Sequence, residues 1–430
     1  MKLKHWVALF VMSFAGEFAW GIQSQIFNLF MFNKIAPRPI LISTMVFVGA
    51  VVATITAIVM GALSDEKGKR KPFILAGYLL WGIFIAFFPL TQHIPVPVAA
   101  VLAVILINGL MSYFRATAYE ASYHAYLTDI TNLKNRGTAQ GVASLGLCFA
   151  MLATFSGLDF IDSFDKSINP LVMQIKGLGF DSFSFFFLIV GIVVIIMGSA
   201  GGLIVEDSGI PAGGEMKVLN RIKSTFKKDF FKVHKNYFLV LLAMGLFMMS
   251  FNAFFQFVLI YLQHYLKIPI DKVGLMVLTS IIIGGMVFSI PAGILCDRYG
   301  RKKIAVAAIL VESIFLFAFA FARDLIWLGI FACFWVGAQT AWMVASYAWS
   351  KDLYPEEKRA EFSGYMTIFQ IGIGGGLGAY IGGVIAELHG VQGIIDGRPG
   401  IIPDSAIFVY AAILVLLPLI PVLKAAEKES

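Results

Sequence analysis

Two opposite charges, Glu17 and Arg115, stand inside long apolar stretches of the chain. Counted at about 1.5 Å per residue from the nearer polar end, Glu17 would lie about 18 Å deep in a helix and Arg115 about 17 Å deep. A strong charge in hydrocarbon costs about 2.5–3.5 kcal/mol on insertion scales, so each should face a cavity or a partner. We therefore expect the two to pair near the middle of a membrane. If Arg115 turns to a solute, Glu17 loses its counter-ion and can take a proton; the alternative is a permanent structural ion pair.

Three further ionisable residues fall in apolar stretches. Glu120 would lie about 9 Å from the same end as Arg115 and is a second candidate proton carrier. His124 is nearer that end, and we interpret it as an interface residue. Glu312 lies in a stretch expected at the periphery, which favours a structural or interfacial role.

Uncharged polar and aromatic side chains suit a hydroxylated ligand. Amides form paired hydrogen bonds with hydroxyl groups, and flat rings stack on the CH faces of sugars. Trp20 lies about one helical turn from Glu17 and Gln23 about one turn beyond Trp20, so one ligand could reach all three. The alternative for each aromatic residue is packing or contact with lipid. The candidate ligand-binding residues are Glu17, Trp20, Gln23, Asn28, Arg115, Tyr119, Asn252, Gln256, Gln339 and Trp342.

The composition places these residues in a membrane protein. Only 14% of the residues are charged and the mean hydropathy is +0.83, which leaves too little polar surface to cover a soluble core of this size. A helix of about 20 apolar residues crosses the hydrocarbon layer. The sequence predicts twelve such spans: 6–32, 42–63, 73–92, 98–126, 138–158, 183–205, 237–265, 272–295, 304–322, 326–349, 362–386 and 405–423.

The charges between the spans predict the orientation. With the N-terminus inside, roughly three times as many Lys and Arg residues fall inside as outside, which follows the positive-inside rule. Both termini are then cytosolic. We expect the protein to lie in the cell (inner or plasma) membrane. The net charge of +7 reflects this topology and does not indicate nucleic-acid binding. Cys148, Cys296 and Cys333 lie in or beside spans and suggest neither disulfides nor a metal site.

Two charged stretches occur twice in the chain. "GALSDEKGKRK" (61–71) returns as "GILCDRYGRKK" (293–303), and "YLTDITNLKNRGTAQG" (126–141) aligns with "WSKDLYPEEKRAEFSG" (349–364). The order of the matches predicts two homologous six-span halves in the same membrane orientation. We expect an N-terminal half at 1–205, a linker at 206–236 and a C-terminal half at 237–430.

Two other stretches have recognisable patterns. The linker sequence "KVLNRIKSTFKKDFFKV" favours an amphipathic helix on the inner leaflet, with a solvated basic linker as the alternative. Gly374, Gly378 and Gly382 are four apart in the eleventh span, a spacing that allows close helix packing or, alternatively, a hinge. The outside loops 159–182 and 387–404 have no explanation in the sequence.

The duplicated "G-x-L-x-D-x-x-G" with its basic run, after the second and eighth of twelve spans, resembles the major facilitator superfamily of secondary transporters. "GEFAWGIQ" (16–23) and "SDEKGKRKPFI" (64–74) are similar to the sucrose/proton and glycoside:cation symporters, where an "RRPFI"-like ending follows the second span. Lys71 stands where those carriers usually have arginine. The aspartates that cation-coupled glycoside carriers place in the second span are missing here, which argues against sodium coupling.

The resemblance implies an all-α membrane protein of twelve transmembrane helices in two six-helix halves. It also implies a cytosolic gate in which Asp65 faces the eleventh span and Arg136, and Asp297 faces the fifth span and Arg359. Simple topogenic charge is the alternative. The predicted gate residues are Gly61, Asp65, Gly68, Arg70, Asp129 and Arg136 in the first half, and Gly293, Asp297, Gly300, Arg301, Asp352 and Arg359 in the second.

Together these features predict a secondary active transporter that imports a sugar or glycoside with protons by alternating access, as a monomer without cofactor or metal. Glu17 and Glu120 would couple the proton. The alternatives within this fold are an exporter of amphipathic drugs or lipids, and an organic anion carrier in which Arg115 binds a carboxylate. A membrane-embedded enzyme or a scaffold is the alternative outside it, but the sequence has no HExxH, GxSxG or Walker sequence.

Overall fold

The computed structural model describes the chain except for residues 1, 132–134, 208–233, 354–364 and 427–430. In the described part, eleven helices are long and apolar enough to cross a membrane, and the shorter apolar helix Lys272–Gly285 supplies the twelfth span. The predicted all-α membrane fold is therefore confirmed. The predicted linker at 206–236 lies almost entirely outside the described residues.

The chain divides into two compact units. Unit 1 comprises Met1–Ala36 and Val51–Ile222, and unit 2 comprises Pro37–Ala50 and Lys223–Ser430. Helix α3 (Pro39–Lys67) is thus shared between them. We call the end of unit 1 at which α1 begins, and the end of unit 2 at which α12 begins, the near end of that unit, and the opposite end the far end.

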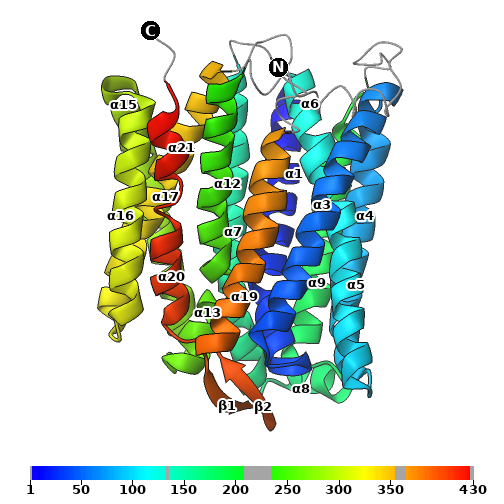
Figure 1. The fold of residues 1–430 in the computed structure, drawn as a ribbon. Coiled ribbons are helices and arrows are strands. Elements are labelled where there is room, and N and C mark those ends of the chain that lie inside the picture. The colour runs from blue at the N-terminus through cyan, green and yellow to red at the C-terminus, as the bar shows by residue number, and fades with distance from the viewer. Residues whose placement is uncertain (1, 132–134, 208–233, 354–364, 427–430) are drawn as a thin grey trace. The chain divides into compact units, whose positions relative to one another are not determined.

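The helices of unit 1 form a bundle around α1, which packs on α7 and α9, while α4 packs on α5 and α9 (Figure 1). Besides the inner part of α3, its elements are α1 (Leu3–Gly21), η1 (Ile22–Ile26), α2 (Phe27–Phe30), η2 (Met31–Ile35), α4 (Lys71–Phe87), η3 (Phe88–His93), α5 (Pro97–Arg115), η4 (Ala116–Tyr123), α6 (His124–Asp129), α7 (Arg136–Lys166), α8 (Pro170–Gly177) and α9 (Ser182–Ile204). Segments η1, η2 and η4 are π-helical.

In unit 2, α12 packs on α17, α19, α20 and η8, and α16 packs on α17 and α20. Its elements are α12 (Lys235–Phe255), α13 (Val258–Ile260), η5 (Tyr261–Tyr265), α14 (Ile270–Ser280), η6 (Ile281–Val287), α15 (Phe288–Tyr299), α16 (Arg301–Phe321), α17 (Leu325–Leu353), η8 (Ile368–Leu377), α19 (Gly378–His389), β1 (Val391–Ile395), β2 (Arg398–Ile402), α20 (Ala406–Leu414) and α21 (Leu419–Lys424).

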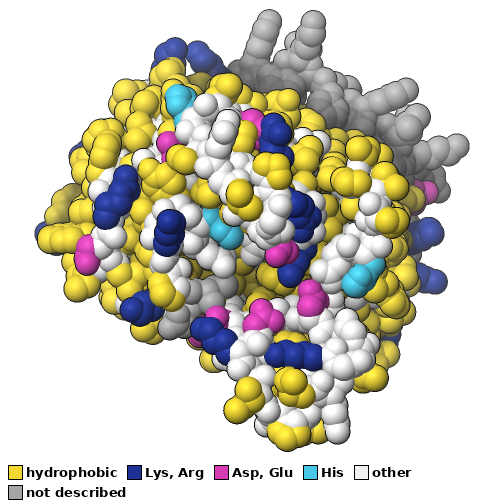
Figure 2. Space-filling view, turned by 90° about the horizontal axis from the view of Figure 1, so that it is seen from below, with side chains coloured by type: hydrophobic (Ala, Val, Ile, Leu, Met, Phe, Trp, Pro, Cys, Tyr) yellow, Lys and Arg dark blue, Asp and Glu magenta, His cyan; other side chains and the backbone are white. Residues whose placement is uncertain are grey.

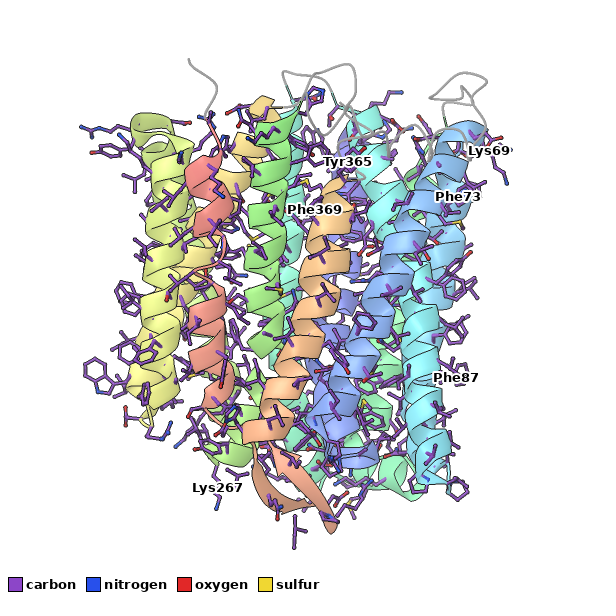
Figure 3. All side chains as sticks on the ribbon, viewed as in Figure 1. Lys69, Phe73, Phe87, Lys267, Tyr365 and Phe369 are labelled. Carbon is purple, nitrogen blue, oxygen red and sulfur yellow. The ribbon has the colours of Figure 1, made fainter. Side chains whose placement is uncertain are left out.

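The glycines of the eleventh span are packing residues. A Cβ atom added to Gly374 would clash with Met248, one at Gly378 with the backbone of Met249, and one at Gly382 with the backbone of Ala253. All three contacts lie on α12, so the glycine face lets two helices approach closely. The packing interpretation is confirmed. Tyr365 and Phe369 lie further toward the near end of the same span (Figure 3), and the Phe369 carbonyl fills the space beside Gly245.

The two long loops that were expected outside, 159–182 and 387–404, carry structure that the span prediction missed. Helix α7 continues to Lys166, eight residues beyond the predicted end of the fifth span, and α8 follows it. Strands β1 and β2 form an antiparallel hairpin at the far end of unit 2. Asp396 and Gly397 form its two-residue turn with φ values of 50° and 77°, the Asp-Gly turn that matches the twist of paired strands.

The hairpin and α19 hold the first turn of α3. The Ile401 amide donates to the Pro37 carbonyl over 2.9 Å, and Arg38 Nε donates to Glu387 Oε1 over 2.6 Å. Deeper along α3, Ser43 Oγ accepts from Gln256 Nε2 over 3.0 Å. These contacts explain why Pro37–Ala50 clusters with unit 2.

Side-chain exposure agrees with a membrane environment. In the view from below, Lys, Arg, Asp, Glu and His side chains are visible among apolar ones (Figure 2). Phe87 is 57% exposed on the outside of α4 (Figure 3), and Leu106 is 66% exposed on α5. Large apolar side chains that face outward along helices of membrane-spanning length meet lipid.

Candidate functional site

Glu17 and Tyr119 connect the first and fourth spans inside unit 1. Tyr119 donates its hydroxyl hydrogen to Glu17 Oε1 over 2.8 Å. Gly16 makes this approach possible, because a Cβ atom there would clash with the Tyr119 ring. On its other face, Tyr119 stacks on Tyr123 with a centroid separation of 4.9 Å. The carboxyl group is therefore held by a neutral donor that a packed ring keeps in place.

Arg115 pairs with Glu120 and not with Glu17, which corrects the prediction from the sequence. Arg115 Nη2 lies 3.3 Å from Glu120 Oε1. The reason is the π-helical turn η4 that follows Arg115. Residues five apart share a face where the backbone hydrogen bonds run from i to i+5, whereas an α-helix would separate them. The two candidates from the fourth span thus form one ion pair.

A third polar contact, nearer the far end of unit 1, also joins the first and fourth spans. Gln23 Nε2 donates to Asn108 Oδ1 over 2.7 Å and lies 3.2 Å from Ser112 Oγ. Neither Asn108 nor Ser112 was among the predicted site residues. The signal was present, because two polar residues four apart in an apolar span lie on one helix face. Gln23 itself belongs to the π-helix η1, and such irregular turns often occur at functional sites.

Three polar atoms of this group remain unsatisfied within the described residues: Gln23 Oε1, Arg115 Nε and Glu120 Oε2. Each is buried, although buried polar groups are nearly always hydrogen-bonded. They belong to the first and fourth spans, which are joined by the hydrogen bonds of Glu17 and Gln23. One donor and two acceptors of this group thus have no hydrogen-bond partner among the described residues.

Asn28 and Trp20 have different surroundings. Asn28 is fully buried and donates to Ser24 of its own helix over 2.6 Å. Its neighbour Phe27 stacks on Phe88, and Phe30 contacts the same ring at a tilt, in an aromatic cluster toward the far end of unit 1. Trp20 is partly buried. Ligand contact stays a prediction for both.

The predicted ligand-binding residues of unit 2 mostly contact their own unit. Asn252 donates to the Met248 carbonyl over 2.8 Å, and Gln256 donates to the Ala379 carbonyl over 2.7 Å. Trp342 is 2% exposed and stacks on Phe247 at 4.7 Å. Gln339 is partly buried. Their role in binding stays a prediction.

Sequence reasoning missed a polar pair in unit 2. Tyr347 donates to Gln370 Oε1 over 2.8 Å, and Gln370 Nε2 lies 3.8 Å from Met244 Sδ. Gln370 belongs to the π-helix η8. A lone glutamine beside the glycine-rich run was the available signal.

At the near end of unit 1, Arg70 organises the repeated charged loop. Its Nη2 lies 2.5 Å from Asp65 Oδ1, its Nε 3.1 Å from Asp129 Oδ2, and its Nη1 donates to Ser64 Oγ over 2.8 Å. Burial opposes the charge of Arg70, but Asp65 and Asp129 raise its pKa above the ordinary value. The side chain of Arg136, the expected partner of Asp65, is not among those described, so that contact stays a prediction.

Charged side chains at this loop also cap the ends of neighbouring helices. Lys71 Nζ donates to the Leu203 carbonyl at the end of α9, and Asp207 accepts from the backbone amides of Arg70 and Lys71 at the start of α4. A cation at a helix C-terminus and an anion at an N-terminus both stabilise the helix dipole. Nearby, a hydrogen bond from Lys4 lowers the pKa of Glu206.

The second copy of the loop repeats this pattern in unit 2. Arg301 Nε lies 2.6 Å from Asp352 Oδ2, and Lys302 Nζ donates to the carbonyls of Leu423 and Ala425 at the end of α21. Arg359 lies outside the described residues, so the expected contact of Asp297 with it stays a prediction.

The glycines of the repeated loop divide into two classes. Gly68 and Gly300 have φ values of 59° and 89°, a conformation that other residues rarely adopt. A Cβ atom at Gly61 would make only an ordinary contact, and one at Gly293 would meet nothing within 4 Å. Only the second glycine of each copy is therefore required by the turn.

Comparisons with known proteins agree with this architecture. The sequence profile of the Major Facilitator Superfamily matches residues 9–158 and 239–430. No curated protein matches the sequence.

Among solved structures, the chain resembles a mutant of the nucleoside transporter NupG (15% identity, TM-score 0.70, 98% of this chain and 100% of that one). It also resembles a bacterial homologue of the human lysosomal transporter Spinster (14%, TM-score 0.71, 100% of both) and a D-xylose-proton symporter (13%, TM-score 0.70, 96% of both). At these identities the likeness shows the fold alone.

Proposed function

Because this chain belongs to the Major Facilitator Superfamily of transporters, we propose that it carries a sugar or glycoside across the membrane together with protons. The observation that carries the proposal is the polar group of unit 1. Glu17, Arg115 and Glu120 are ionisable groups inside spans, and three of the group's buried polar atoms have no partner among the described residues. Such groups are costly in a membrane and usually serve transport.

The unsatisfied atoms suit a hydroxylated solute. A sugar hydroxyl can donate to Gln23 Oε1 or Glu120 Oε2 and accept from Arg115 Nε, so neighbouring hydroxyls could satisfy all three atoms. The π-helical turns at η1 and η4 widen the two helices at these residues. An organic anion is a poorer fit, because Glu120 already neutralises Arg115.

Proton coupling is assigned to Glu17, with Glu120 as the second candidate. Glu17 accepts a hydrogen bond from a neutral phenol and forms no ion pair within the described residues, so it can exist with or without a proton without breaking such a pair. Glu120 would have to leave Arg115 to be protonated. Two similar folds belong to proteins described as a D-xylose-proton symporter and a nucleoside transporter, and both solutes carry a pentose ring. That correspondence supports a sugar as the solute.

The test is uptake into proteoliposomes that contain the full chain. We expect one or more pentoses, hexoses or glycosides to enter, to be driven by an inward proton gradient, and to acidify the lumen. Glu17→Gln should abolish gradient-driven accumulation while leaving downhill exchange. Uptake that does not depend on the proton gradient would indicate a uniporter. Thermal stabilisation of the detergent-solubilised protein by lipids or hydrophobic cations, with no response to sugars, would favour the exporter.

A further inference from the structure

Glu312 is the buried acid that the proposed transport site does not use. It lies near the middle of α16 and is fully buried. Of the two expected roles, structural or interfacial, the interfacial one is therefore wrong. Neither carboxyl oxygen has a hydrogen-bond partner in the described part of the chain. Intramembrane acids are rare and costly, so an acid with both oxygens unsatisfied calls for a specific explanation.

On its own helix, Glu312 shares a buried face with apolar residues. Ala308 and Leu316, one turn away on either side, are buried on the same face of α16. Ala308 belongs to a core cluster with Trp342 of α17. At the next position, Ser313 donates to the Ala412 carbonyl of α20 over 2.7 Å. Glu312 thus lies at the level where α16 packs against α17 and α20.

No described charge lies near this level on any helix packed against α16. On α16 itself the nearest cation is Lys303, nine residues or about 13 Å away. Helices α15, α17 and α21 carry their charged residues in their last turns: Asp297 and Arg298 on α15, Lys351 and Asp352 on α17, and Lys424 on α21. Helix α20 has no charged residue, and its one titratable group is the phenol of Tyr410. Past the end of α16, Arg323 already donates to Tyr261 and to two carbonyls.

We propose that Glu312 is a proton-binding site of unit 2, and that its bound proton holds α16 in its packing against α17 and α20. An ionised carboxylate here would be an unpaired charge among apolar side chains, so the described packing requires the neutral acid. Opening of this packing would let water reach the carboxyl group, which then releases one proton to water and takes it back on closing. No other bond forms or breaks. The proposal involves neither the sugar nor Glu17.

Linkage sets the sign of the effect. The folded protein keeps this proton at neutral pH, whereas the unfolded chain releases it above the ordinary pKa of a glutamate, about 4.3. The unfolded state then binds fewer protons, so stability falls as pH rises. For one proton the unfolding equilibrium constant increases about tenfold per pH unit.

The experiment compares thermal unfolding of the detergent-solubilised full chain, wild type and Glu312→Gln, between about pH 6 and about pH 8, a range above the ordinary glutamate pKa. We expect the wild type to lose stability with pH and the variant, an uncharged isostere, to lose less by about one proton's slope. Equal slopes for the wild type and Glu312→Gln would overturn the proton site.

Infrared spectroscopy provides a second readout that does not depend on the glutamine variant. The folded protein at neutral pH should show the carbonyl band of a protonated carboxylic acid, and Glu312→Asp should shift the frequency of that band. Absence of the band, or a band that the aspartate leaves unchanged, would show that Glu312 is ionised or already satisfied. Either result contradicts the proposal, whatever the outcome of the uptake experiments.

Discussion

The hydroxyl of Tyr119 lies 2.8 Å from Oε1 of Glu17, so a tyrosine of the fourth span holds the carboxyl group of the first. A phenol can donate to a carboxylate and still remain beside a neutral acid, whereas an arginine would favour only the charged form. This contact replaces the expected Glu17–Arg115 ion pair. It leaves Arg115 and Glu120 as a separate pair within unit 1.

Tyr119→Phe should weaken proton coupling more than solute binding. The change removes one hydrogen bond to an ionisable group, worth about 1.5–3 kcal/mol, while the ring stays stacked on Tyr123. We expect gradient-driven uptake to fall about tenfold or more, with little change in sugar-induced thermal stabilisation. The matched control is Tyr123→Phe, because the Tyr123 hydroxyl contacts the Leu9 carbonyl and not Glu17. Equal losses in the two variants would contradict the assignment.

Gly16→Ala should reproduce the loss without removing any polar group. The added methyl group would clash with the ring of Tyr119 and push it away from Glu17. Overpacking of this kind typically costs about 1–3 kcal/mol of stability. Coupled uptake and the melting temperature should both fall. Gly141→Ala is the control, since a Cβ atom there meets nothing within 4 Å, and it should be neutral or slightly stabilising.

Glu120→Gln should leave a buried guanidinium without its counter-ion. The side chains of Arg115 and Glu120 are 11% and 15% exposed, and removal of one partner from a buried pair costs about 3–5 kcal/mol. We therefore expect a marked drop in thermal stability. The double variant Arg115→Gln and Glu120→Gln should recover most of that stability but not transport. Recovery of transport as well would show that the pair is only structural.

Arg70→Lys should destabilise the near end of unit 1 although it keeps the charge. Lysine cannot reproduce the planar fork that contacts Asp65, Asp129 and Ser64 at once. Loss of these charge-assisted bonds should cost about 2 kcal/mol, seen as a lower melting temperature. Lys69→Gln, at an exposed position of the same loop, should be nearly neutral. A large effect of Lys69→Gln would indicate that loop charge in general matters.

Several features of the fold follow from local sequence alone. The apolar spans predict membrane helices because the backbone must satisfy its own hydrogen bonds in lipid. The requirement for a positive φ explains the second glycine in each copy of the charged loop, Gly68 and Gly300. The four-residue spacing of Gly374, Gly378 and Gly382 indicated a close packing face. The Asp-Gly pair at 396 and 397 is also a local signal, since it favours the two-residue turn of the hairpin.

The candidate site was only partly predictable. The sequence identified Glu17, Gln23, Arg115, Tyr119 and Glu120, because an ionisable or polar side chain in an apolar span is informative wherever it lies. It could not identify their partners. Depth counted along α-helices placed Glu17 and Arg115 at one level, but the π-helical turn η4 rotates the residues that follow Arg115 and brings Glu120 onto its face.

The sequence by itself determined that this chain crosses a membrane twelve times, that its charged loop is duplicated, and which few polar residues must be accommodated among apolar ones. These properties depend on composition and on spacing along one helix. Only the tertiary structure decided that Tyr119 donates a hydrogen bond to Glu17, that Arg115 forms an ion pair with Glu120, and that the Glu312 carboxyl group has no hydrogen-bond partner within the described residues. Pairing between helices depends on their rotation and close packing, and a single π-turn or glycine contact changes both.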